Sequence, residues 1–193
     1  MPGELRGLEY IHKQHGSLPW FDILQPAIHI ARYGFTVSKD LAARMDLIPS
    51  PSFLVTDPIW SVDFAPNGTR VGAGDLMTRK RYADLLEEIA NHGPDVFYNG
   101  PIAESTVAAL RAANGIMTVQ DLADYKVAIR PVKQISYREQ RVYACSVPAG
   151  GVVVLNVLKT VEGYSDFGWP AQLDLSTHRL TEAIRFGYGL VGP

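Results

Sequence analysis

The stretch Ser146–Leu158, SVPAGGVVVLNVL, decides how the second half of the chain folds, because a short apolar segment passes through a proline–glycine turn into a long apolar run. This order predicts a strand end, a tight loop and the start of a helix. A phosphate-binding loop needs GxxxxGK[ST] or GxGxxG, and PAGG matches neither. We favour a packing role, in which Gly150 and Gly151 let strand and helix approach closely. Gly150→Val is then expected to destabilise the fold.

The spacing of apolar residues predicts strands before this stretch and helices within and after it. Alternating valine, isoleucine and tyrosine in residues 127–137 and 140–146 predict two or three strands. Residues 152–163 predict a helix. A last helix is expected over residues 177–189, capped by Ser176 or Thr177.

Helical spacing dominates the first two-thirds of the chain. The expected helices span residues 2–16, 18–35, 38–45 (capped by Ser38), 78–93, 102–115 and 118–125 (capped by Thr118). Pro26 lies inside the second helix and predicts a kink or two abutting helices. Residues 47–78 are rich in proline and glycine and predict a long loop that wraps the surface, and residues 93–101 predict a turn-rich link.

Two of these helices carry clear apolar faces. Leu5, Leu8 and His12 share one face of the first helix, and Tyr82, Leu85, Leu86 and Ile89 form the face of the fourth. Helices dominate and strands cluster late, so the sequence predicts an α/β (α+β) fold, with residues 1–193 as one partial domain.

The bulk composition excludes several functions. Apolar residues make up 47% of the 193 residues, which fills a globular core, and the net charge of −2 does not favour nucleic acid. The start of the chain has no apolar signal-peptide region, and no apolar run reaches the roughly 18 residues of a membrane-spanning helix. The single cysteine, Cys145, lies in the apolar stretch VYACS and is expected to be a buried small hydrophobe.

The remaining polar residues form no convincing catalytic group. The five histidines, His12, His15, His29, His92 and His178, lack a metal-binding motif, so no metal and no cofactor is predicted. The carboxylates at Glu87, Glu88, Glu104, Asp121 and Asp124 are interpreted as solvated. Asn67-Gly68-Thr69 is a candidate N-glycosylation sequon in a turn-rich segment, although such triplets are common by chance.

A series of segments together resembles the gamma-glutamyltranspeptidase (glutathione hydrolase) family. The segments are PGELRGLEYIHKQHG, LPWFDILQPAIHIARYGF, FAPNGT, FYNGPIAE, GIMTVQDLADYK, PAGGVVVLNVLKTVEGY and HRLTEAIRFGYG. They cover almost the whole chain in the family order, and their sequences are most similar to those of fungal members. The resemblance implies part of the large subunit of an N-terminal nucleophile hydrolase, whose core is a four-layer αββα fold.

The resemblance also implies a chemistry for the whole enzyme. Such a precursor cleaves itself, and the new N-terminal threonine of the small subunit attacks the γ-glutamyl amide of glutathione. Water or an acceptor amino acid then takes the glutamyl group. The sequence contains no Thr-Thr-His processing motif, and the family's substrate-binding arginine is expected upstream of Pro2. We therefore assign no catalytic or substrate-binding residue to this chain, and Arg6, Arg32 and Arg185 are not nominated.

Two hypotheses follow from the resemblance. In the first, the chain is a segment of an enzyme of glutathione catabolism, a hydrolase and acyltransferase, and is inactive alone; its partners are the small subunit of the same precursor and γ-glutamyl substrates. In the second, it is a truncated product that acts as a non-catalytic partner of the full-length enzyme. The resemblance places the protein in the secretory pathway, as a membrane-anchored, extracellular or vacuolar glycoprotein.

Overall fold

The computed structural model of the chain describes residues 2–50 and 52–189, and its contacts separate an N-terminal unit, Met1–Val127, from a C-terminal unit, Ala128–Pro193. The described helices of the N-terminal unit are α1 (Glu4–His15), α2 (Trp20–Tyr33), α3 (Lys39–Asp46), α4 (Phe53–Thr56), α5 (Pro58–Phe64), α6 (Lys80–His92), α7 (Asp95–Tyr98), α8 (Pro101–Ala112) and α9 (Val119–Ala123). Its short strands β1 (Phe35–Thr36) and β2 (Leu76–Met77) pair antiparallel.

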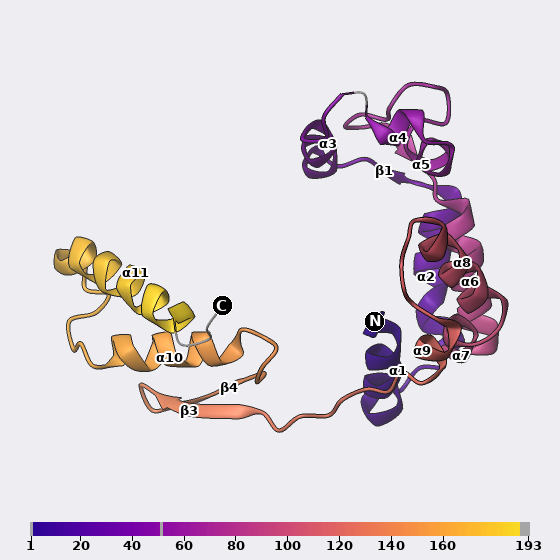
Figure 1. The fold of residues 1–193 in the computed structure, drawn as a ribbon. Helices are drawn as coiled ribbons and strands as arrows, with labels where there is room; N and C mark the ends of the chain where they lie inside the picture. Colours follow the sequence, from indigo (N-terminus) through magenta and orange to yellow (C-terminus); the bar gives the residue numbers. More distant parts are fainter. Residues whose placement is uncertain (1, 51, 190–193) are drawn as a thin grey trace. The chain divides into compact units, whose positions relative to one another are not determined.

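The helices α2 and α6 lie side by side in the N-terminal unit (Figure 1). They bury Ile28 and Ala31 of α2 against Ala83 and Ala90 of α6. The alanines have no bulk beyond Cβ, so the two helices can approach closely. This contact aligns two long helices that are far apart in the sequence.

The helix α2 is continuous through Pro26, so the expectation of two abutting helices is wrong. Proline lacks the N–H that would bond to the carbonyl of Asp22, four residues earlier. Asp22 lies in the first turn of the helix. The missing bond would join the first and second turns of the helix, and the residues after Pro26 remain helical as far as Tyr33.

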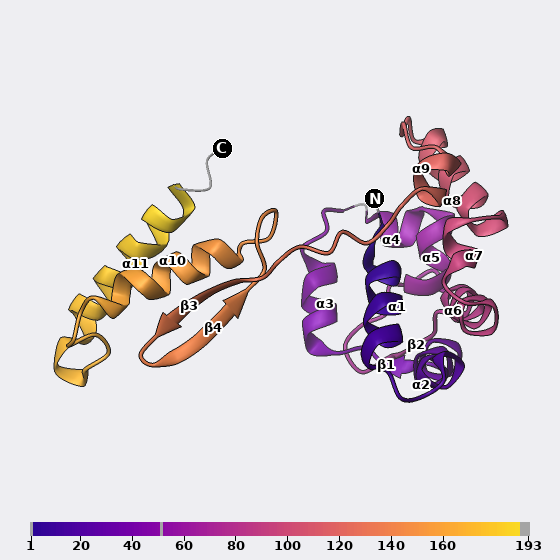
Figure 2. The same cartoon turned by 90° about the horizontal axis from the view of Figure 1, so that it is seen from below.

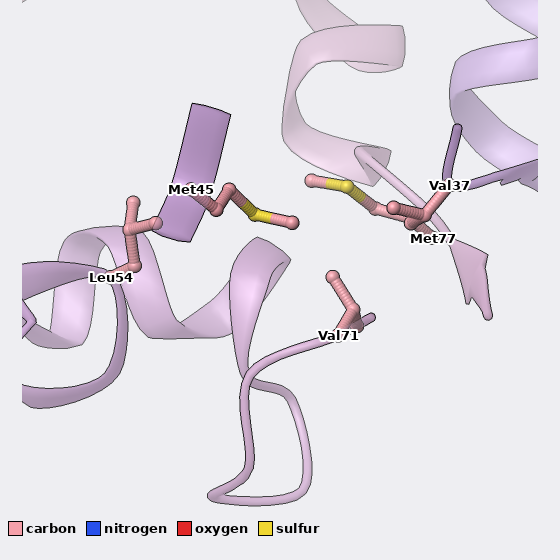
Figure 3. Packing of buried hydrophobic residues seen from close by; sticks show 5 residues of the cluster. All are labelled: Val37, Met45, Leu54, Val71 and Met77. Atoms are coloured by element: carbon pink, nitrogen blue, oxygen red, sulfur yellow. The ribbon is translucent and has the colours of Figure 1, made fainter. Parts of the chain in front are cut away.

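Residues 47–78 do not form a surface loop, which corrects the sequence expectation. Within them Ser52 and Asp57 cap the short helices α4 and α5. Leu54, Val71 and Met77 are buried together with Val37 and Met45, as Figure 3 shows. The apolar residues of this segment follow neither a helix nor a strand period, so only the tertiary fold shows that they form a core.

The segment 93–101 also differs from the expected link. It contains the one-turn helix α7, and the side chain of Tyr98 is 0% exposed. Tyr98 is buried with Ala103, Val107 and Leu122. An aromatic side chain in a turn-rich segment therefore organises the packing of α7, α8 and α9.

In the C-terminal unit, a hairpin and two helices form a small core. The elements are β3 (Lys133–Tyr137), β4 (Gln140–Ala144), α10 (Gly151–Glu162), a 3-10 helix, η1 (Pro170–Gln172), and α11 (Leu173–Gly189). The strands pair antiparallel, with Ile135 opposite Val142. Figure 2 shows α10 lying beside both the hairpin and α11. Val153, Val157 and Val161 of α10 are buried against Ala183 of α11.

The helix α11 begins earlier than expected. It starts at Leu173, so Ser176 and Thr177 lie inside it and neither is its N-cap. The hydroxyl of Ser176 instead accepts a hydrogen bond from the N–H of Gly168 (2.9 Å) and is buried. The serine satisfies a backbone donor of the preceding loop rather than one of its own helix.

The predicted α/β class is confirmed, because the described residues are rich in helix and contain two small antiparallel sheets. Ser38 and Thr118 cap α3 and α9 as predicted, Thr118 in a capping box with Asp121. None of the described helices has both the length and the hydropathy needed to cross a bilayer. The assignment of residues 1–193 to a single domain stays a prediction.

Candidate functional site

An apolar groove of about 690 Å³ lies among α1, α2, α6 and α7 of the N-terminal unit. The groove is lined by Pro2, Glu4, Leu5, Leu8, Ile11, His12, His15, Gly16, Trp20, Ile23, Leu24, Tyr82, Leu85, Leu86, Ile89 and Phe97. The apolar face predicted for α6 and the face predicted for α1 therefore both line it. The groove also includes Ile11 of α1 and Ile23 of α2, which were not predicted to belong to an apolar face. A wider apolar stripe on each helix is the signal that would have included them.

Two contacts of Trp20 hold one end of the groove. The indole Nε1–H donates a hydrogen bond to the carbonyl of Ile89 (3.1 Å), which joins the start of α2 to the end of α6. The ring of His12 packs edge-on against Trp20 at 5.3 Å between centroids, and its Nε2 lies 2.8 Å from the carbonyl oxygen of Leu18. His12 thus has a structural role at the groove.

The start of α1 is held by a buried tyrosine. The hydroxyl of Tyr98 donates to the carbonyl of Pro2 (2.9 Å) and accepts from the N–H of Arg6 (3.1 Å). Burial raises the pKa of Tyr98 above its ordinary value, so the hydroxyl stays protonated and able to donate. The guanidinium of Arg6 lies 4.4 Å from the centre of the tyrosine ring and pairs with Asp95 at 2.6 Å.

The groove can bind apolar surface, and its described lining lacks the hydroxyl, thiol and amine side chains that most often act as nucleophiles. Its lining contains no serine, threonine, cysteine or lysine, and Glu4, His12, His15 and Tyr82 are its polar members. Leu8 is 52% exposed and Ile11 is 58% exposed. Contiguous apolar surface of this kind marks an interaction site. The geometry therefore favours association with another apolar element.

The loop PAGG contributes packing, and the structure assigns this role to one glycine. A Cβ on Gly151 would lie 2.2 Å from the carbonyl oxygen of Cys145 and 2.8 Å from the Cβ of Ala144. A Cβ on Gly150 would meet no atom within 4 Å. The close approach of strand and helix is thus confirmed at Gly151, and the expectation that Gly150 is part of it is wrong.

Cys145 is exposed, so the expectation of a buried small hydrophobe is also wrong. Residues alternate sides along an extended segment. The Cβ of Ala144 lies beside the start of α10, next to Gly151. Its neighbour Cys145 consequently points away from that contact, although the composition of VYACS is apolar.

Several carboxylates that were interpreted as solvated have partners. Glu87 and Asp84 bind the guanidinium of Arg32 at 3.1 and 2.7 Å, which links α2 to α6. Asp121 accepts hydrogen bonds from the hydroxyl and the N–H of Thr118, and these lower the pKa of its carboxyl. Asp121 is exposed and the Glu87 side chain is 47% exposed, so both remain solvated as interpreted, and they also act in capping and packing.

The described residues place no cluster of metal ligands. In residues 2–50 and 52–189, no group of three or more His, Cys, Asp or Glu side chains could hold a metal ion.

The three arginines that were not nominated for substrate binding each pair with a carboxylate. The pairs are Arg6 with Glu9, Arg32 with Glu87 and Arg185 with Glu182. Asn67, the candidate acceptor residue, lies with Gly68 and Thr69 on the surface.

Comparison with known proteins identifies the relatives of this chain. The family model for gamma-glutamyltranspeptidase matches residues 1–190. A glutathione hydrolase proenzyme of Arthroderma benhamiae is 50% identical over 190 residues, which cover 98% of this chain and 32% of that protein. A glutathione hydrolase of Aspergillus flavus is 47% identical over 193 residues, covering 98% of this chain and 33% of the relative. The chain thus spans about a third of the length of these curated relatives.

A solved structure agrees with the sequence relatives. The crystal structure of gamma-glutamyltranspeptidase from Helicobacter pylori superposes with a TM-score of 0.87 at 29% identity, covering 97% of this chain and 54% of that chain. The fold and the sequence therefore identify the same family. The chain belongs to the gamma-glutamyltranspeptidase family.

Proposed function

We propose that residues 1–193 are a segment of the large subunit of a glutathione hydrolase, an enzyme that transfers the γ-glutamyl group of glutathione to water or to an acceptor amine. The observation that supports this proposal is the family match over residues 1–190, together with fungal relatives named glutathione hydrolase. Because the chain spans about a third of those relatives, the activity belongs to the whole protein.

The proposal assigns no catalytic step to this chain. The described lining of the groove contains no serine, threonine, cysteine or lysine, and the exposed Cys145 lies in the C-terminal unit, outside the groove. The attacking threonine and the arginine that binds the substrate carboxylate are expected outside residues 1–193. The N-terminal and C-terminal units then act as scaffold, and both belong to one domain that the remainder of the proenzyme completes.

The groove supplies the attachment surface in this proposal. A groove of about 690 Å³ with Leu8 and Ile11 more than half exposed leaves apolar area in contact with water. Each square ångström of apolar area removed from water contributes roughly 25 cal/mol. The proposed occupant is an apolar element of the same proenzyme, outside residues 1–193, because about two-thirds of each curated relative lies beyond the matched segment.

A chimera tests the proposed activity. Residues 1–190 replace the matched segment of the Arthroderma benhamiae proenzyme, and cleavage of a γ-glutamyl anilide is measured for the chimera, for the relative and for this chain alone. We expect the chimera to process itself and to cleave the anilide, and the chain alone to match buffer. Cleavage by the chain alone would contradict the placement of the catalytic residues. A chimera that folds and processes itself but cleaves nothing would contradict the assigned function.

A second comparison tests the groove within the same chimera. Ile11→Asp places a charge on the groove surface, whereas Ile59→Asp places one on α5, where Ile59 is 69% exposed and does not line the groove. We expect Ile11→Asp to reduce self-processing and Ile59→Asp to leave it unchanged. Equal processing in the two variants would refute the attachment role of the groove.

The second candidate function is that of a non-catalytic partner, and the same exposed groove favours it. In that case a short chain of residues 1–193 binds the full-length enzyme through Leu8 and Ile11. The intact native mass of the protein, recovered with an antibody against residues 79–92, separates the two. A heavier precursor or a paired small subunit supports the enzyme segment, and a 21.2 kDa chain bound to a full-length paralogue supports the partner.

A further inference from the structure

We propose that Asn67 is the acceptor of an N-linked glycan. The sequence Asn67-Gly68-Thr69 has the required acceptor spacing, and Gly68 satisfies the rule that the middle residue is not proline. A sequon alone is a weak signal because it occurs by chance. The structure adds an exposed and well-defined loop that presents the asparagine to solvent.

The sequon lies at the tip of a turn. The N–H of Gly68 donates to the carbonyl of Ala65 (2.9 Å), which places Pro66 and Asn67 at the two central positions of a β-turn. Gly68 follows with φ of +77°, and a Cβ built on it would meet no atom within 4 Å. Asn67, Gly68 and Thr69 are all exposed. Open space surrounds the middle residue, so both the asparagine and the threonine can be reached.

The base of the turn is fixed to the buried cluster beneath it. The N–H of Val71 donates to the carbonyl of Phe64 (2.9 Å), and this bond closes the loop of residues 65–70. Ala65 and Val71 are buried, and the guanidinium of Arg70 pairs with Asp46 at the end of α3. Figure 3 shows the chain that leads into Val71 looping away from the buried side chains. The structure thus separates a buried base from an exposed tip.

The modification adds bulk where the fold has room for it. The residues that line the apolar groove fall within 2–24 and 82–97, so none comes from the loop of residues 65–70. A glycan on Asn67 therefore does not line the proposed attachment surface.

The reaction needs a second substrate, a lipid-linked oligosaccharide diphosphate. The side-chain nitrogen Nδ2 of Asn67 forms a bond to C1 of the first sugar, and the bond from C1 to the diphosphate oxygen breaks. The lipid diphosphate leaves with the electron pair, and one amide proton of Asn67 passes to a base of the transferase. Thr69 contributes the hydroxyl that the transferase recognises, so its loss must abolish the reaction.

The test uses the full chain behind a cleavable secretory leader in yeast, with both the secreted and the microsomal pools collected. Intact mass is measured before and after peptide N-glycosidase F in ¹⁸O water, which converts a glycosylated asparagine to labelled aspartate. We expect one glycan, with the label at Asn67. Thr69→Ala must remove it and Thr69→Ser must retain it. A glycan that survives Thr69→Ala would overturn the assignment.

A matched control keeps a negative result informative. Ile116→Thr creates a second Asn-Gly-Thr triplet at Asn114, in another exposed turn where Ile116 is 93% exposed. We expect this variant to carry a second glycan, at Asn114. If Asn114 is modified while Asn67 is not, the transferase was present and the proposal is refuted.

The native protein provides the second readout. Chain recovered from its source with the antibody against residues 79–92 is treated with the same glycosidase. A labelled Asn67 supports the proposal, and an unmodified Asn67 overturns it. Neither experiment measures γ-glutamyl transfer, so an unglycosylated Asn67 leaves the proposed enzyme activity unaffected.

Discussion

The hydroxyl of Tyr98 accepts a hydrogen bond from the backbone N–H of Arg6 over 3.1 Å, although the two residues are 92 positions apart. Arg6 is the third residue of α1. The N-cap residue of α1 is Gly3, which has no side chain that could accept a hydrogen bond. The first N–H groups of a helix lack partners within the helix. Tyr98 therefore performs from a distant helix the task that a local capping residue usually performs.

Tyr98→Phe removes this cap without changing the apolar volume of the side chain. The N–H of Arg6 and the carbonyl of Pro2 both lose their partner, so we expect the free energy of unfolding to fall by about 1–3 kcal/mol. Urea denaturation measures the change. Tyr10→Phe is the control, since Tyr10 is 40% exposed on the same α1. An equal loss in the two variants would show that the cap is not responsible.

Gly151→Ala tests the close contact between β4 and α10. The new Cβ must displace the backbone carbonyl of Cys145, since the undisturbed distance is 2.2 Å. We expect a loss of about 1–3 kcal/mol in unfolding free energy, the usual cost of overpacking. Gly150→Ala, where the added Cβ meets no atom within 4 Å, should change stability by no more than about 0.5 kcal/mol. A larger effect at Gly150 would contradict the assigned packing.

Glu139→Gly should stabilise the hairpin of β3 and β4. Arg138 and Glu139 occupy its turn with φ of +44° and +67°, a conformation that favours glycine and asparagine. The left-handed conformation costs an ordinary residue about 1–2 kcal/mol, and glycine's extra entropy in the unfolded chain offsets about 0.5–1 kcal/mol. We expect a net gain of about 0.5–1 kcal/mol. Gln140→Gly, one residue later in β4, should lower stability in the same denaturation assay.

Glu162 should make the C-terminal unit sensitive to acid. A hydrogen bond from Lys159 and one from the N–H of Arg138 (2.6 Å) lower the pKa of its carboxyl below the ordinary value. The stability that this carboxylate provides is fully present above its unfolded pKa of about 4.3 and is lost as pH falls through the folded pKa. We expect Glu162→Gln to weaken the dependence of unfolding free energy on pH in this acidic range. Glu139→Gln, exposed in the neighbouring turn, should leave the dependence intact.

Local signals in the sequence accounted for most of the helices. The caps at Ser38 and Thr118 and the apolar faces of α1 and α6 depend on residues within one or two turns of each other. Family membership also followed from the order of segments and was confirmed over residues 1–190. The apolar groove was predicted only as two separate faces, because the sequence does not show that α1 and α6 line the same groove.

The errors share one physical cause. Leu54 and Val71 are separated by proline and glycine, and they become core because chain segments far apart in sequence pack around them. Ser176 or Thr177 was expected to cap α11, but the hydroxyl of Ser176 accepts a hydrogen bond from the N–H of Gly168 in the preceding loop. Burial and hydrogen-bond partners depend on neighbours in three dimensions. Hydrophobic periodicity shows only which face of a helix or strand is buried, not which residues cover that face.

The sequence by itself determined the helix periods, the turn at Pro148–Gly151 and the family, since these depend on residue types at short or recurring spacing. Only the tertiary structure decided that Tyr98 caps α1, that Gly151 rather than Gly150 meets β4, and that Cys145 is exposed. The physical reason is that a hydrogen bond or a van der Waals contact requires atoms within a few ångströms. Folding alone sets that distance for residues far apart along the chain.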